Sequence, residues 1–175
     1  VVPNPKYFDS PVVPMPDLIR LLRSKAVLLP GVRVTLTVEK TGEHSAWQYE
    51  AGLRGYLGEV LSTQGAGETV LLFEGEQYTE AGHETFAEGE GAQWVAAFTE
   101  EGALARESYV NLIPTTQGGT HVNGFRTGLT EAIREFCEFR NLVPRGVELA
   151  PEDVWQKASF VLSVKMHEPQ FAGQM

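Results

Sequence analysis

The last third of the chain carries the strongest folding pattern in the sequence, a long helical segment between two short strand-like ones. Residues 123–141 place apolar side chains three and four positions apart, which is the spacing of one helix face. Those positions are Phe125, Leu129, Ile133 and Phe136. Residues 108–113 and 159–164 are short and apolar, which is typical of strands, and a short helix is expected over 151–155.

Helical and strand patterns also alternate through the first two thirds of the chain. Residues 17–29 are spaced as a helix that Pro30-Gly31 ends, and residues 32–38 alternate as a half-buried strand does. We expect further strands over 45–50, 70–73 and 93–98, and a further helix over 51–61. This mixture predicts an α+β fold, in which helices pack on one face of a sheet.

The negative charge of the chain is concentrated in its middle. The 175 residues hold 14 Lys and Arg against 23 Asp and Glu, a formal charge of -9. Residues 55–105 contain ten acids and no base, so the flanking parts are near neutral. We interpret residues 63–105 as a solvated, variable acidic region; a cation site or an acidic docking surface is the less favoured alternative. The pI of about 4.9 argues against a free-standing nucleic-acid-binding protein.

Length and composition exclude several classes of protein. The length predicts one domain over residues 1–175. No apolar run reaches the roughly 18 residues of a transmembrane helix, so no membrane partner is expected. The single cysteine, Cys137, excludes an internal disulfide framework and favours a reducing, cytoplasmic compartment. The chain starts at Val1 without a signal-peptide pattern and ends just after the last expected strand, so we expect a piece excised from a longer protein.

The loop Gly118-Gly119-Thr120-His121 lies between an expected strand and an expected helix. Glycines permit unusual backbone angles, and the backbone N–H groups at a helix start can hold an anion. A tight turn with a capping threonine is the favoured interpretation. No two histidines have the spacing of metal ligands, so no metal site is predicted.

The single cysteine and the three tryptophans, which could carry a function, have structural interpretations. Cys137 lies mid-helix, and the three tryptophans lie on amphipathic segments, so we expect all four in the core. The sequence lacks a phosphate-binding GxxxxGK[ST] loop, a dinucleotide-binding glycine motif and a GxSxG nucleophile motif. These features predict a domain without catalytic residues or a self-contained active site.

The segment YVNLIPTTQGGTHVNGFR, from Tyr109 to Arg126, resembles a signature of bacterial type IIA topoisomerase ATPase subunits. Gln117 before the glycine pair is similar to the topoisomerase IV form, whereas gyrase more typically has an acidic residue there. Further similar segments follow in family order along nearly the whole chain. They are FDSP at 8–11, LLRSKA at 21–26, FCEFRN at 136–141, PRG at 144–146, LSVKM at 162–166 and PQFAGQ at 169–174.

This resemblance implies a transducer domain, which follows an ATP-binding domain of the GHKL type. The implied fold is similar to domain 2 of ribosomal protein S5, a two-layer arrangement of a mixed sheet with helices on one face. It contains a left-handed βαβ crossover, which general rules put at about 2% of such connections. The acidic residues 63–105 carry little of the resemblance, as a variable region would.

The resemblance also implies a nucleotide contact at the end of the chain. The family carries Gln-Thr-Lys in the loop after the last strand, and this loop reaches the ATP γ-phosphate. Gln174 matches the glutamine, Met175 stands where threonine is expected, and the lysine is absent from the sequence. The implied cofactors, ATP and Mg2+, therefore belong to the parent enzyme, and none is expected on these residues alone.

The implied role is the relay of ATP binding and hydrolysis to gate movement during DNA strand passage and decatenation. The implied partners are the upstream ATPase domain, a second copy of the B subunit, the A subunit of topoisomerase IV, and DNA. Candidate bases for DNA phosphates, chosen by charge alone, are Arg20, Arg23 and Arg126. The alternative function is a standalone anion- or protein-binding module that uses the loop from Gly118 to His121.

Overall fold

The chain divides into two compact units, of which one ends at Gly52 and the other starts at Leu53. This computed structural model describes residues 4, 6–7, 12–66, 70–144 and 146–171. The single domain over residues 1–175 that the length predicts stays a prediction. Among the described residues, the strands of the first unit form a two-stranded sheet of their own, separate from the five-stranded sheet of the second unit.

The first unit is a helix followed by a hairpin. These elements are α1 (Met15–Leu28), β1 (Val34–Val38) and β2 (Glu43–Trp47). The two strands pair antiparallel, from Val34 opposite Trp47 to Val38 opposite Glu43, across a turn in which Gly42 has a φ of 74°. The predicted helix 17–29 and the predicted strand pair are confirmed, with small shifts at their ends.

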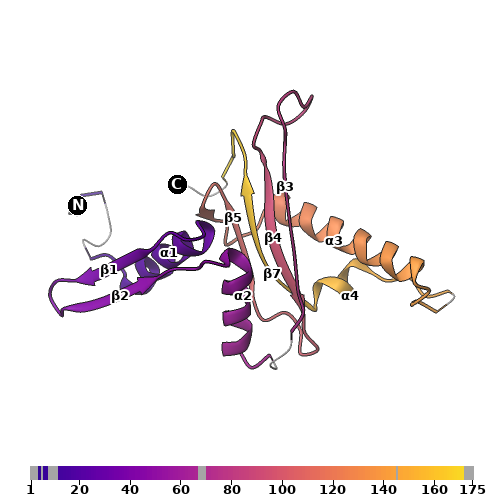
Figure 1. Ribbon diagram of the computed structural model, residues 1–175, viewed down its shortest axis with the longest axis horizontal. Helices are drawn as coiled ribbons and strands as arrows, with labels where there is room; N and C mark the ends of the chain where they lie inside the picture. Colours follow the sequence, from indigo (N-terminus) through magenta and orange to yellow (C-terminus); the bar gives the residue numbers. More distant parts are fainter. Residues whose placement is uncertain (1–3, 5, 8–11, 67–69, 145, 172–175) are drawn as a thin grey trace. The chain divides into compact units, whose positions relative to one another are not determined.

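The second unit is built on a five-stranded mixed sheet with the order β3-β4-β7-β5-β6 (Figure 1). Its strands are β3 (Leu72–Tyr78), β4 (Gly91–Phe98), β5 (Arg106–Val110), β6 (Ile113–Pro114) and β7 (Ala158–Lys165). The central strand β7 pairs antiparallel with β4 and parallel with β5. The mixed sheet and the α+β class are therefore as predicted.

The acidic stretch contributes two strands to this sheet, β3 and β4. Val95, Ala96 and Ala97 on β4 are fully buried, so the stretch contains part of the core. Within residues 70–105, the acids lie on the edge strand β3 and on the connecting segments. The solvated region that the charge pattern predicts is therefore confined to the loops and one sheet edge.

Helices α3 (Thr120–Phe139) and α4 (Pro151–Trp155) cover one face of the sheet. The Phe125 ring lies 5.6 Å from that of Trp94 and 5.2 Å from that of Phe160. The Trp155 ring lies 5.0 Å from that of Phe160. These aromatic contacts, centred on a side chain that is only 2% exposed, form the core between the helices and the sheet.

Helix α2 (Gly52–Thr63) lies against the opposite face, which differs from the expected single helical layer (Figure 1). Tyr56 Oη donates to Glu107 Oε1 at 2.6 Å. Glu107 pairs with Val161 in the sheet, and adjacent residues of a strand point to opposite faces, so Glu107 faces away from Phe160. Amphipathic spacing fixes which side of α2 is buried, but it does not specify which face of the sheet receives it.

The connection from β5 to β7 crosses over the sheet, because these adjacent strands are parallel. It runs through β6, α3 and α4, and so carries the loop that the sequence singles out. The left-handed sense of this βαβ crossover stays a prediction.

Candidate functional site

The loop from Gly118 to His121 leads directly into α3. Gly118 has a φ of 72° and Gly119 a φ of 150°. A Cβ atom on Gly119 would lie 2.9 Å from the His121 ring, so a larger residue does not fit there without a shift. The helix starts at Thr120, three residues before the predicted start, and its N-cap Gly119 makes no side-chain cap hydrogen bond. Thr120 is therefore not the cap that the sequence predicts.

His121 ties this loop to the sheet. Its Nε2 lies 2.9 Å from Thr115 Oγ1, and Thr115 Oγ1 lies 2.6 Å from Ser108 Oγ on β5. Burial lowers the pKa of His121 below its ordinary value of 6.5, so the ring is uncharged at neutral pH. A neutral imidazole that already contacts Thr115 supports the start of α3 and contributes no positive charge for an anion.

The three candidate DNA-binding arginines each have partners within the chain. Arg126 forms an ion pair with Glu152 at 2.5 Å and lies over the Trp155 ring. Arg20 forms an exposed pair with Asp17 at 3.0 Å. Arg23 Nε donates to the Tyr49 hydroxyl at 2.8 Å. Arg20 and Arg23 share α1 in the first unit, whereas Arg126 belongs to α3 in the second. Their contact with DNA stays a prediction.

Gln174 and Met175 lie outside the described residues, but the segment that leads to them is held by two side chains. Asn111 exchanges two hydrogen bonds with the backbone of Met166, and Glu90 accepts one from the backbone N–H of His167. We call Asn111, Glu90 and these two backbone positions the exit clamp. Sequence reasoning missed both side chains, although Asn111 lies within the signature segment.

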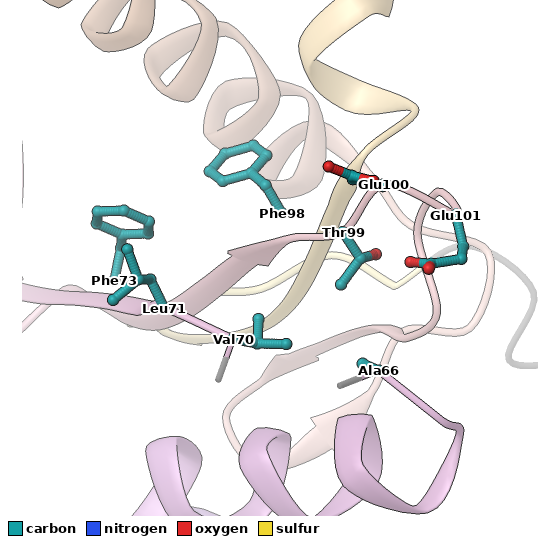
Figure 2. Close-up of a pocket in the computed structure, with 8 residues that line it drawn as sticks. All are labelled: Ala66, Val70, Leu71, Phe73, Phe98, Thr99, Glu100 and Glu101. Atoms are coloured by element: carbon teal, nitrogen blue, oxygen red, sulfur yellow. The ribbon is translucent and has the colours of Figure 1, made fainter. Parts of the chain in front are cut away.

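An open pocket of about 470 Å³ lies where β3 begins and β4 ends (Figure 2). The rings of Phe73 and Phe98 meet edge to face at 6.2 Å, and Glu100 and Glu101 lie at the rim. Among the described residues, its lining holds no His, Cys, Lys or Arg, and its one hydroxyl, that of Thr99, already donates to the Gly102 carbonyl. The described lining therefore offers apolar surface with two carboxylates at its rim.

The described part of the chain holds neither a cluster of metal ligands nor a membrane-spanning helix. Across residues 4, 6–7, 12–66, 70–144 and 146–171, no three His, Cys, Asp or Glu side chains gather as metal ligands do. Over the same ranges, none of the helices has the length and apolar character needed to cross a bilayer.

Comparison with known proteins places the chain in a family. The family model described as DNA gyrase B matches residues 52–175, and its start coincides with the boundary between the two units. The topoisomerase IV B subunit of Pseudomonas aeruginosa is 49% identical over 98% of this chain, and that of Escherichia coli is 46% identical over the same share. In each case the match covers 26% of the relative, so the chain spans about a quarter of their length.

A solved structure of a topoisomerase IV domain is similar to this chain in fold and in sequence. The topoisomerase IV ATP-binding domain of Francisella tularensis, in complex with a small-molecule inhibitor, matches 99% of this chain and 44% of its own. The TM-score is 0.72 and the sequence identity is 32%. By its family match, its relatives and its fold, this chain belongs to the DNA gyrase B family and is similar throughout to the B subunit of topoisomerase IV.

Proposed function

We propose that this chain is the transducer part of a topoisomerase IV B subunit. In this role it relays nucleotide binding and hydrolysis to gate movement during DNA strand passage and decatenation. The observation that carries the proposal is the similarity of 46–49% identity along 98% of the chain, which includes the signature loop and the segment leading to Gln174. The parent would be an ATP-dependent type II topoisomerase, and its partners would be DNA, a second B subunit and the A subunit of topoisomerase IV.

The loop around the glycine pair does not fit a nucleotide site of its own. Residues 115–125, which surround the glycine pair, contain no Lys or Arg. His121 is neutral at pH 7 and contacts Thr115. We therefore assign ATP with Mg2+ to the upstream domain of the parent, and the same observations weigh against a standalone anion-binding module.

The chain's own contribution is mechanical. A packed sheet with helices on both faces moves as one body, because its aromatic core leaves few internal degrees of freedom. The segment after β7 carries Gln174, whose amide would donate to a phosphate of the neighbouring nucleotide. The free energy available for the relay is the difference in affinity between the docked and undocked arrangements of this segment.

The test is ATP turnover by the full-length protein, with and without Gln174→Ala. We expect a loss of roughly tenfold or more in the variant, which corresponds to about 1.4 kcal/mol of transition-state stabilisation. The matched control is Gln170→Ala in the same segment, which should leave turnover unchanged. Unchanged turnover in Gln174→Ala would contradict the phosphate contact.

A further inference from the structure

Asn111 holds the chain immediately after β7 as a neighbouring strand would. Its Nδ2 donates to the Met166 carbonyl at 2.8 Å, and its Oδ1 accepts from the Met166 N–H at 2.9 Å. Its own backbone N–H donates to the Val164 carbonyl at 2.9 Å. β7 ends at Lys165, so Asn111 extends the backbone pairing by one residue beyond the strand.

Glu90 holds the next residue from the other side of β7. Its Oε1 accepts from the His167 N–H at 2.5 Å, and its Oε2 accepts from the Ala87 N–H at 2.9 Å. These two hydrogen bonds lower the pKa of the Glu90 carboxyl, so it is ionised at neutral pH. Two consecutive backbone N–H groups, of Met166 and His167, are thus bound by side chains that adjoin the two strands next to β7, since Asn111 follows β5 and Glu90 precedes β4.

The turn that presents Asn111 is conformationally costly. Asn111 and Leu112 have φ values of 48° and 66°, and they join β5 to β6 in a two-residue turn. Asparagine visits this left-handed region readily, whereas leucine does not. Such strain persists where the surroundings enforce it, and it clusters at functional positions.

We propose that Asn111 and Glu90 are positioning residues that fix where and in which direction the chain leaves the sheet on its way to Gln174. The inference rests on the proposed function of Gln174. The clamp ends at His167, seven residues before Gln174 in the sequence. We expect the clamp to act through the direction in which the chain leaves β7, rather than through the length of chain that it leaves free. Loop-closure entropy changes only slowly with loop length, whereas a misplacement of about 1 Å at a reacting group is costly.

The first measurement is hydrogen exchange in the full-length protein carrying Asn111→Gly. Glycine tolerates the same positive φ, so the turn and the fold should persist while both side-chain bonds to Met166 disappear. We expect exchange at the Met166 amide to become roughly tenfold faster or more. The matched control Leu112→Gly relieves strain in the same turn, keeps the Asn111 amide and should leave that exchange unchanged. Unaltered exchange at Met166 in Asn111→Gly would overturn the clamp.

The second measurement separates positioning from mere support. In the same proteins, Asn111→Gly should lower the kcat of ATP turnover by about three- to tenfold, with little change in KM. Adding it to Gln174→Ala should cause no further loss, because both changes then act through one contact. Full additivity, or normal turnover in Asn111→Gly alone, would overturn the positioning role. If Gln174→Ala alone has normal turnover, the proposed function fails and the positioning role with it, while hydrogen exchange still decides whether the clamp exists.

Discussion

His121 links the start of α3 to the sheet through Thr115 and Ser108. The two contacts, of 2.9 Å and 2.6 Å, join three residues that lie within 13 positions of one another in the sequence. Because burial disfavours the charged ring, His121 makes this link as neutral imidazole at neutral pH. At the scale of single residues, we therefore propose a structural role for the signature histidine.

The lowered pKa of His121 predicts how the stability of the chain changes with pH. The folded pKa of His121 lies below 6.5, so between that lower value and 6.5 the unfolded chain binds more protons than the folded one. The free energy of unfolding should therefore rise with pH through this window and level off above about 6.5. His121→Gln keeps a polar partner for Thr115 and removes the titration. Urea unfolding at several pH values should show a shallower dependence in the variant, and equal slopes would contradict the account.

The glycine pair could be identified from the sequence because its spacing before a helix is a local pattern. Asn111 could not, because its partner is Met166, 55 positions away in the sequence. A local signal existed in part, since asparagine is favoured in turns with positive φ. Leu112, which follows it, is not a residue typical of such turns, so the sequence predicts one strand over 108–113. In the structure these residues form the end of β5, a turn and the start of β6.

At the scale of elements, the contact between β7 and the two helices on its face forms an aromatic part of the core of the second unit. Phe160 is 2% exposed and its ring contacts those of Phe125 and Trp155. The loop before α3 and the exit clamp after β7 both depend on the position of this strand.

Phe160→Ala should therefore destabilise the chain strongly. Loss of a buried phenylalanine costs about 3–5 kcal/mol, because transfer free energy is lost and a cavity remains. Phe139→Ala is the control: this ring on α3 is 80% exposed, so a change within about 0.5 kcal/mol is expected. Chemical unfolding measures both, and comparable losses in the two variants would refute this packing scheme.

Local patterns predicted the existence of most elements but not their assembly. Helix α3 and strands β4 and β7 follow clear periodicities, and they occur where the sequence predicts them. The face on which α2 packs depends on contacts such as Tyr56 with Glu107, which lie 51 positions apart and leave no trace in local spacing. For the same reason, the acidic stretch concealed how deeply the strand β4 within it is buried.

At the scale of the whole molecule, the chain is two units joined at Gly52, and the family model starts at that residue. Length alone did not reveal the boundary, because 175 residues fit one domain or two. A relay requires that the second unit respond as a body to a nucleotide held elsewhere in the parent. The internal geometry of the second unit should stay constant while its distance to the first unit changes.

The most direct test is a pair of spin-label distances in the full-length protein, with its native cysteines replaced. One pair joins the two units, through cysteines introduced by Thr41→Cys and Glu138→Cys, and the other lies within the second unit, through Glu84→Cys and Glu138→Cys. A non-hydrolysable ATP analogue should shift the first distance and leave the second unchanged, and Gln174→Ala should abolish the shift. An inter-unit distance that does not respond to the analogue would contradict the relay.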